Sequence, residues 1–277
     1  MPTIGKHTKK SLSASKKQQH TVAKANELIQ QSRFSMTVQQ NKIILYMISQ
    51  IRPDDTGKEA YTFSVGEFCR ACNIDYDNGK NLSNVKRTLK AVASICVWIE
   101  QPNEKDVLLH WIDKVVLDRR THNFEVSFSP DMLPYLYDLK TRYTSYALSN
   151  VLVMESKYGI RLYELLKSYQ HTYDGEVTFD LAELKSRIDA EKYKRYPDFR
   201  RNVLEIATQD INEYSDINVE YEAFSENGGR GIDTISFKIK EPEGLDKEIR
   251  TIRRERKLDA DGKSTQRAFI EAMKLEN

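Results

Sequence analysis

The chain contains two stretches of matching sequence that lie about 116 positions apart, counted from Tyr61 to Val177. Residues 61–68 read YTFSVGEF, and residues 177–184 read VTFDLAEL. The match continues at nearly the same offset, with residues 85–89 corresponding to residues 200–204. Solenoid repeats recur every 20–50 residues or so, whereas a period this long is typical of two tandem domains. The sequence therefore predicts a duplicated unit.

The length and charge of the chain are consistent with a duplication. Domains commonly contain roughly 100–150 residues, so a chain of 277 residues can form two domains that each bury a core. Lys and Arg total 43, and Asp and Glu total 41, which leaves a net charge of only +2. This balance gives no general signal for binding a polyanion. Any case for nucleic-acid binding must therefore rest on where the charges lie.

The cysteines and the hydropathy pattern indicate the compartment. Cys69, Cys72 and Cys96 form an odd set without a second pair, which argues against a disulfide framework and favours a reducing environment. No apolar run approaches the roughly 18 residues of a membrane span, and the start of the chain lacks a signal-peptide core. We therefore expect a soluble cytoplasmic protein without membrane contact.

Both copies have the same predicted order of elements: a helix, a strand, two more helices and then antiparallel strands. Apolar residues spaced three to four apart indicate the helices, and alternating residues indicate the strands. In the first copy these elements are expected at residues 36–51, 61–63, 64 onward, 81–96, 97–101, 107–117 and 123–128. In the second copy they are expected at residues 156–169, 177–179, 181–188, 197–214, 217–224 and 232–239. Ser64 with Glu67, and Asp180 with Glu183, are predicted capping boxes.

This order is typical of the winged helix, in which the third helix enters the DNA major groove and a β-hairpin wing contacts the flanking backbone. The predicted fold class is α+β, with two tandem winged-helix domains at residues 22–138 and 139–241. A disordered basic arm is expected at residues 1–21 and a charged tail, either solvated or partner-binding, at residues 242–277. Winged helices also bind proteins, so the fold alone leaves that alternative open.

The start of the third helix in the second copy is expected to contact base edges, because only this end approaches the bases closely. Arg offers a planar fork to guanine, and Asn pairs with adenine; each such pair contributes about 1–3 kcal/mol of discrimination. The candidates are Arg200, Arg201 and Asn202. The alternative for Arg200 and Arg201 is a solvated helix face paired to Glu205, which lies four residues after Arg201.

A basic cluster just before this helix is suited to phosphate contacts. It contains Lys185, Arg187, Lys192, Lys194 and Arg195. In the second wing, Arg230 at a glycine-rich turn is a candidate for the minor groove, although a plain hairpin turn explains it equally well.

The first copy carries a weaker version of the same pattern. Its third helix presents polar and basic residues that either contact DNA directly or serve packing and dimerisation. These residues are Ser83, Asn84, Lys86, Arg87 and Lys90.

Catalytic and metal motifs are not supported by the sequence. Residues 262–264 read GKS like the end of a Walker A motif, but Lys257 stands where the first glycine is needed. Cys69 and Cys72 have metal-knuckle spacing without a partner pair, and we interpret them as core cysteines of a short helix. The five histidines are scattered. We therefore expect no enzymatic activity, no catalytic residues, no cofactor and no metal site.

Three segments resemble a known family. They are residues 22–29 (VAKANELI), residues 143–148 (YTSYAL) and residues 156–166 (SKYGIRLYELL). With these residues the chain resembles the iteron-binding plasmid replication initiators of the RepE and RepA class, from about Val22 to Lys240. In the last segment the apolar residues have core spacing, so Lys157 or Arg161 is only a secondary candidate for phosphate contact.

The resemblance implies a pair of winged-helix domains, of which the first also dimerises and the second makes the main contact with iterons in double-stranded plasmid origin DNA. It places the main recognition helix at residues 197–214. It further implies that monomers start replication, that dimers repress their own gene, and that host initiator, helicase and primase are recruited without catalysis. The tail after Leu245 has no match in this resemblance.

The leading hypothesis is a plasmid replication initiator that acts in the bacterial cytoplasm, in association with the plasmid and nucleoid. A transcriptional repressor of the same architecture without a replication role is the first alternative. An interaction scaffold whose winged helices bind proteins is the second.

Overall fold

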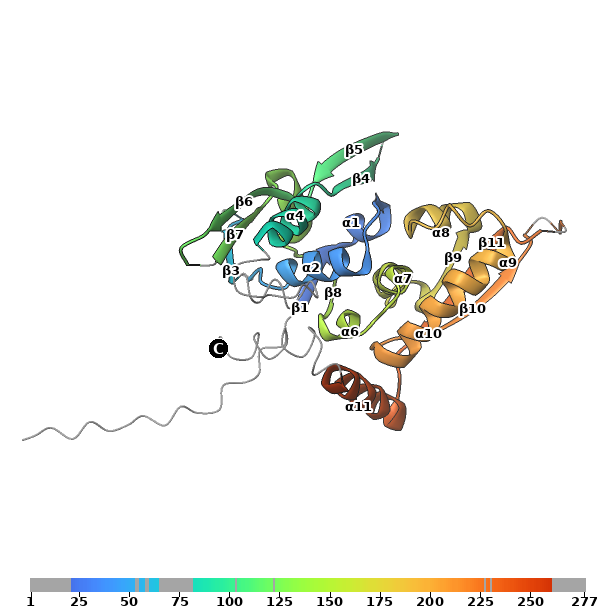
Figure 1. The fold of residues 1–277 in the computed structure, drawn as a ribbon. Coiled ribbons are helices and arrows are strands. Elements are labelled where there is room, and N and C mark those ends of the chain that lie inside the picture. Colours follow the sequence, from blue (N-terminus) through green and yellow to red (C-terminus); the bar gives the residue numbers. More distant parts are fainter. Residues whose placement is uncertain are drawn as a thin grey trace, which may run out of the picture.

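Two units lie side by side in the computed structural model, with α7 between them (Figure 1). The structure describes residues 21–52, 55–57, 60–64, 82–102, 104–121, 123–226, 228–229 and 231–260. The predicted basic arm, Cys69, Cys72, the Ser64–Glu67 capping box and the GKS segment at 262–264 lie wholly or partly outside these ranges. None of the described helices is long and apolar enough to cross a bilayer.

The first unit is built around α2 and a three-stranded sheet. Thr37 and Gln40 form a capping box that starts α2, and the apolar residues of this helix from Ile43 to Ile48 are buried. The elements of this unit are α2 (Val38–Ile48), β3 (Tyr61–Ser64), α4 (Leu82–Ala93), β6 (Ile112–Asp118) and β7 (Asn123–Phe128), and the strand order is β3-β7-β6. The second α-helix that the sequence predicts here falls on residues outside the described ranges.

The second unit repeats this plan. Its elements are α7 (Lys157–Lys167), β9 (Glu176–Asp180), α8 (Leu181–Arg187), α9 (Tyr196–Phe199), a π-helical turn (Arg200–Leu204), α10 (Glu205–Tyr214), β10 (Asn218–Phe224) and β11 (Thr234–Lys240). Its strand order, β9-β11-β10, corresponds to β3-β7-β6. The registers also agree, because Phe63 pairs with Phe124 and Phe179 pairs with Ile235, and all four side chains are buried. The predicted duplication therefore holds at the level of strand register.

One predicted strand of the first unit is wrong. The sequence suggested a single strand at residues 107–117, but the chain turns at Trp111, so that β5 (Lys105–His110) and β6 belong to different sheets. β5 pairs with β4 (Cys96–Gln101), and β4 pairs with β2 (Ser32–Arg33). Trp111 is buried against Phe34, an anchor that the alternation of neighbouring residues does not reveal.

A strand at the beginning of the described chain completes the connection between the units. β1 (Thr21–Ala25) pairs along its whole length with β8 (Tyr143–Ala147), and α1 (Asn26–Gln31) follows β1. The short helices η1 (Pro130–Met132), α5 (Leu133–Leu136) and α6 (Ser149–Leu152) lie on either side of β8 in the chain, and η2 (Tyr173–Gly175) precedes β9. The boundary between residues 138 and 139 stays a prediction.

A buried ionic cluster lies where β1, β8 and α7 meet. Lys24 and Glu164 form an ion pair although their side chains are only 2% and 1% exposed. Tyr146 donates a hydrogen bond to the same carboxylate. Burial lowers the pKa of Lys24, and the Glu164 carboxylate opposes this shift. Because an unpaired charge is costly at such a depth, each partner depends on the other.

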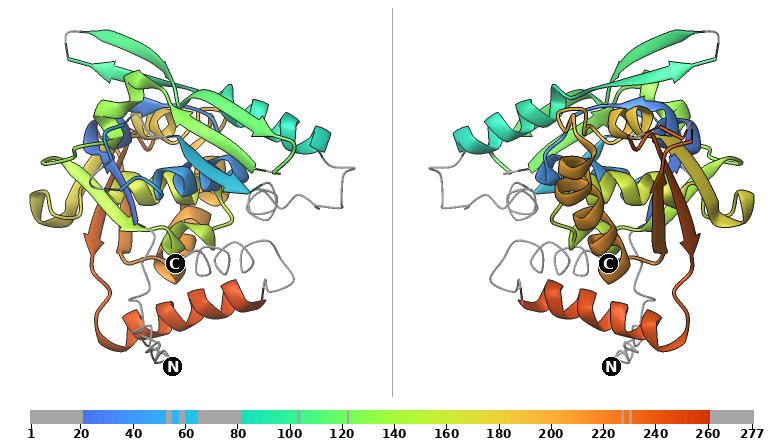
Figure 2. Two further views of the ribbon diagram at one scale, coloured as in Figure 1. Left: turned by 90° about the vertical axis from the view of Figure 1, so that its left-hand side faces the viewer. Right: turned by 90° about the vertical axis from the view of Figure 1, so that its right-hand side faces the viewer.

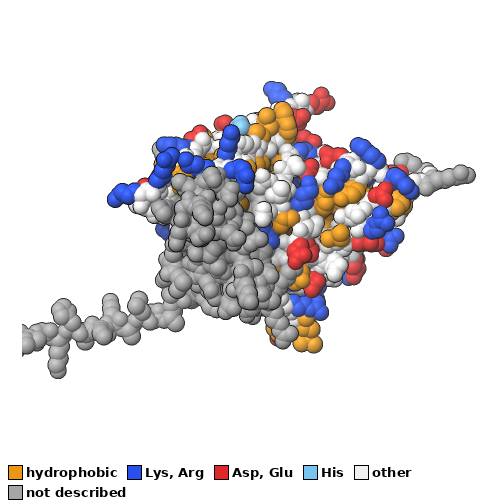
Figure 3. Space-filling view, viewed as in Figure 1, with side chains coloured by type: hydrophobic (Ala, Val, Ile, Leu, Met, Phe, Trp, Pro, Cys, Tyr) orange, Lys and Arg blue, Asp and Glu red, His pale blue; other side chains and the backbone are white. Residues whose placement is uncertain are grey.

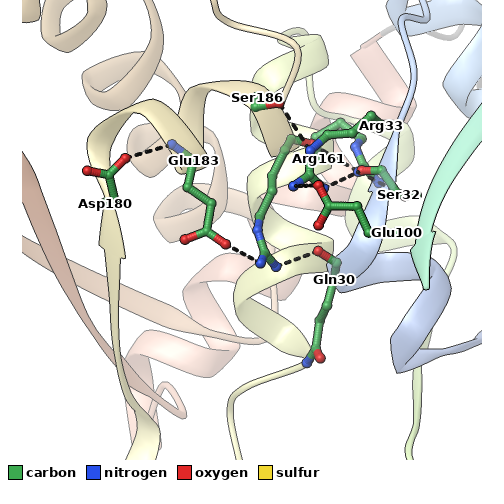
Figure 4. Close-up of polar contacts among 9 residues, drawn as sticks. Gln30, Ser32, Arg33, Glu100, Arg161, Asp180, Glu183 and Ser186 are labelled. Atoms are coloured by element: carbon green, nitrogen blue, oxygen red, sulfur yellow. Dashed lines mark hydrogen bonds and ion pairs between the residues drawn. The ribbon is translucent and has the colours of Figure 1, made fainter. Parts of the chain in front are cut away.

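The seam between the units is polar. Arg33 of β2 donates to Ser186 Oγ at 3.1 Å and to Glu100 at 2.8 Å, and Arg187 of α8 donates to the carbonyl oxygen of Gln30 (Figure 4). Arg161 of α7 donates to Ser32 Oγ at 3.3 Å. Arg161 is only 4% exposed, so the secondary prediction that it contacts phosphate is wrong.

The helix after the second unit is α11 (Gly244–Ala260), which lies below both units in the two side views (Figure 2). Arg250 of this helix is 5% exposed and packs against the second unit. Residues 244–248 of the helix are exposed, so both alternatives for the tail stay predictions.

Candidate nucleic-acid interface

The helix-turn-helix of the second unit starts from a well-formed cap. Asp180 Oδ1 accepts hydrogen bonds from the backbone amides of Ala182 and Glu183 at 2.8 and 3.0 Å, which confirms the predicted N-cap of α8. The Glu183 side chain instead forms an ion pair with Arg187, so the second half of the predicted capping box is wrong. The cap fixes α8 at the end of β9, and α8 supports the helix that follows.

The following helix has one apolar and one polar face. Pro197 lies in its first turn, as expected for a residue that lacks an amide proton. Phe199, Val203, Ala207 and Ile211 are fully buried at a four-residue spacing. The opposite face is therefore available for a ligand.

A π-helical turn interrupts this helix at Arg200–Leu204. In such a turn, residues five apart come together, and π turns are frequent at functional sites. As a result Arg200 Nε bonds Glu205 at 2.8 Å, and this bond raises the pKa of the guanidinium. The alternative of an exposed arginine paired with Glu205 is therefore met by Arg200, whereas Arg201 instead approaches Asp198 at 3.6 Å.

The three residues expected to contact bases differ in the exposure and the hydrogen bonds of their side chains. The side chain of Arg200 is 57% exposed and that of Arg201 is 74% exposed, so both project from the first turns of the helix. Asn202 is half-buried and donates through Nδ2 to the carbonyl oxygen of Asp198 at 2.7 Å. Its amide group must leave this bond before it can pair with a base. These assignments stay predictions.

The basic cluster before the helix divides into two groups. Lys192, Lys194 and Arg195 are exposed beside the first turn of the recognition helix. Lys185 is buried over the ring of Phe199 at 5.2 Å, and Arg187 is buried at the seam. The prediction of phosphate contact is therefore wrong for Lys185 and Arg187, because both stems pack in the interior.

The second wing is present as the hairpin of β10 and β11. Its tip is held by Asp233, which accepts from the amide of Glu226 at 2.9 Å, and by Ser225, which accepts from the amide of Gly229 at 3.0 Å. Gly228 has a φ of +66°, which glycine adopts without strain. Arg230 lies outside the described residues, so its predicted contact is untested.

The first unit presents an exposed basic face as well. Lys86, Arg87 and Lys90 are exposed on α4, while the side chains of Ser83 and Asn84 lie outside the described part. Sequence reasoning missed Arg119 and Arg120, which are exposed at the tip of the β6–β7 wing. Asp118 Oδ1 orders this tip by accepting from the amide of Arg120 at 2.7 Å. The signal that could have identified these residues is a pair of adjacent arginines between the predicted strands at 107–117 and 123–128.

Basic side chains of both units are visible on the same face of the molecule. In the space-filling view, Lys and Arg gather over α4 and the β6–β7 hairpin on the left and around α9 on the right (Figure 3). A long polyanion could touch both groups at once.

The second unit has a helix-turn-helix followed by a β-hairpin, and the described elements of the first unit repeat its strand order and register, which defines a tandem winged-helix protein. Residues 21–167 match the family described as initiator replication protein, WH1, and residues 180–239 match initiator Rep protein, WH2. The chain belongs to this family of replication initiators. The resemblance and the fold expected from the sequence are thus confirmed.

Two known proteins are similar to the chain. A replication initiation protein of Escherichia coli is 28% identical over 227 residues, which is 79% of this chain and 69% of that protein. The crystal structure of the Pi initiator protein in complex with iteron DNA superposes with a TM-score of 0.63 and 17% identity, over 83% of this chain and all of that one. The second likeness supports the fold. Family membership and the first relative favour a replication role over a repressor without one.

Proposed function

We propose that this chain initiates plasmid replication by binding repeated origin sequences, or iterons, in double-stranded DNA. The observation that carries the proposal is the exposure of Arg200 and Arg201 at the start of a helix whose other face is buried. Exposed guanidinium groups at this position suit guanine edges in the major groove. The Pi initiator protein, which shares the fold, was crystallised in complex with iteron DNA, and this complex supports the same ligand class.

The two units would meet successive major-groove faces about one helical turn apart, so the site should be about two turns long. The second unit makes the main contact, and Lys192, Lys194 and Arg195 neutralise phosphates. The first unit adds auxiliary contacts through α4 and through Arg119 and Arg120 of its wing. Such contacts set the position on the duplex without reading sequence.

The protein opens the origin and recruits the host initiator, helicase and primase, without catalytic chemistry of its own. This part of the proposal rests on the family to which the chain belongs. Its site of action would be plasmid DNA in the bacterial cytoplasm.

A footprint of the purified protein on the DNA that flanks its own gene tests the proposal. We expect protected repeats of about two helical turns. An origin plasmid that lacks its initiator should replicate when this chain is supplied in trans. Binding without sequence preference at moderate salt, together with failure in trans, would instead favour a protein-interaction scaffold.

Self-association through the first unit is a further part of the proposal, with autorepression by the dimer. β5 is the edge strand of the sheet β2-β4-β5, and Trp98 and Leu108 are opposite one another on its solvent face. Their exposed fractions are 49% and 46%. Large apolar side chains paired across β4 and its exposed edge strand β5 favour association with a second copy.

Leu108→Lys is expected to shift the protein toward monomer, because a charge on this face opposes its burial. Sedimentation velocity at several concentrations measures the change. Val116→Lys is the matched control, since Val116 is 40% exposed in the same unit but belongs to the other sheet. An unchanged monomer fraction in Leu108→Lys, or an equal shift in both variants, would contradict the assignment.

A further inference from the structure

The helix α11 lies beyond the part of the chain that matches the family, which ends at residue 239. The helix nevertheless contacts the recognition helix and the segment that follows it. Arg250 Nη1 donates to the carbonyl oxygen of Ile217 at 2.8 Å, and its Nη2 donates to Asn218 Oδ1 at 2.9 Å. Arg250 is also held by Asp246 of its own helix at 2.8 Å. The side chain is thus fixed in one orientation at the start of β10.

A second arginine of α11 joins two elements that are distant in sequence. Arg254 Nη1 donates to Asn150 Oδ1 at 2.5 Å and to the carbonyl oxygen of Tyr214 at 3.1 Å. Asn150 belongs to α6, in the connection between the units, and Tyr214 is the last residue of α10. A guanidinium at a helix C-terminus satisfies a free carbonyl group and interacts favourably with the helix dipole.

The same contacts continue into α7. Asn150 Nδ2 donates to the hydroxyl of Tyr163 at 3.0 Å, and this hydroxyl donates to Asp216 at 2.8 Å. Lys167 pairs with Asp216 at 2.9 Å. The C-terminal end of α10 is therefore tied to α6, α7 and α11 together, and α7 also carries Arg161 at the seam with the first unit.

The way in which α11 docks suggests that it can be removed without unfolding the second unit. An amphipathic helix normally buries its apolar face, but here Leu245 is 70% exposed and Ile252 is 47% exposed, while Arg250 is buried. A polar cavity of about 210 Å³ remains beneath the helix, lined by Lys167, Asp216, Lys247 and Arg250 among others. Among the side chains of α11 that the structure describes, from 244 to 254, the fully buried one is that of Arg250.

We propose that α11 is a clamp that holds the C-terminal end of the recognition helix against the connection between the units. Arg250 and Arg254 are positioning residues, and the clamp sets the spacing at which the two units meet DNA. The DNA part of this inference rests on the proposed function. Loosening the clamp lowers the effective concentration of the first unit at its half of the site, without changing the groups that touch DNA.

The test compares the full chain with the variant R250A/R254A on three duplexes: the footprinted site, the site with one base pair inserted between its halves, and the half bound by the second unit. We expect the variant to lose about tenfold in affinity for the footprinted site and little for the half-site. The penalty for the inserted base pair should shrink. Equal losses on all three duplexes, or no loss on any, would overturn the clamp.

Arg253→Ala is the control, because Arg253 is exposed on the same helix and its loss removes one positive charge while leaving the contacts of Arg250 and Arg254 in place. Hydrogen exchange without DNA gives an independent measurement. The amides of Asn212 to Ser215 should exchange faster in R250A/R254A than in R253A or the unmodified chain. Unchanged exchange there overturns the clamp even if DNA binding is normal. If the unmodified chain binds DNA without sequence preference, the proposed function fails. The exchange rates of these amides still test whether α11 holds the end of the recognition helix.

Discussion

Replacing Arg200 and Arg201 with alanine is expected to remove discrimination at particular base pairs of the site. Each bidentate contact between arginine and guanine contributes about 1–3 kcal/mol, so each substitution should cost about tenfold or more on the cognate duplex and little on unrelated DNA. Competition gel shifts, in which the competitor duplexes carry single base-pair changes, measure this loss of affinity. Arg200 should show the smaller loss of the two, because its bond to Glu205 must first be broken.

The matched control replaces Lys192 and Lys194, which also removes two positive charges from the same side of the unit. Phosphate contacts do not read sequence, so binding should weaken evenly for all duplexes, and the slope of log affinity against log salt should fall by about two. If all four substitutions weaken cognate and unrelated DNA alike, the assignment of Arg200 and Arg201 to base edges is untenable.

Glu164→Ala is expected to have the largest effect on stability. It leaves the Lys24 ammonium buried without its counter-ion and removes the acceptor of the Tyr146 hydroxyl. Breaking a buried pair in this way costs about 3–5 kcal/mol, which chemical denaturation would detect as a lower free energy of unfolding.

Two further variants separate this effect from a general loss of charge. Glu176→Ala breaks an exposed pair with Lys238 and should change stability little. Lys24→Met combined with Glu164→Gln removes the Lys24–Glu164 pair and keeps an acceptor for Tyr146. It should recover part of the loss, because buried Arg161, which approaches Glu164 at 3.8 Å, still lacks its counter-ion. A double variant no more stable than Glu164→Ala would show that the cost does not lie in the unpaired Lys24 charge.

Much of the fold was predictable because the chain encodes it twice. Local signals were reliable where side chain and backbone act on each other directly, as at the Asp180 cap and Pro197. Periodicity also identified α4 and the buried face of α10. The turn at Trp111 was missed because an alternating pattern continues through it, and only sheet pairing assigns the two halves to different sheets.

The candidate site was predicted less completely, because charge alone does not show whether a basic residue is buried. Lys185 and Arg187 have the same sequence signature as Lys192 and Lys194, yet tertiary contacts bury only the first pair. The pairing of Arg200 with Glu205 depends on a π-helical turn that ordinary helical spacing does not predict. The docking of α11 was hidden for a related reason, since its buried face is the polar one.

The pairing of β1 with β8 has a practical consequence for dissecting this protein. A fragment that ends at residue 138 would leave β1 without its neighbouring strand and Lys24 without Glu164. Its open strand edge would invite aggregation, and poor behaviour of such a fragment would say nothing about the intact unit. Genetic dissection should therefore cut after Lys167, so that the opening strand keeps its neighbour.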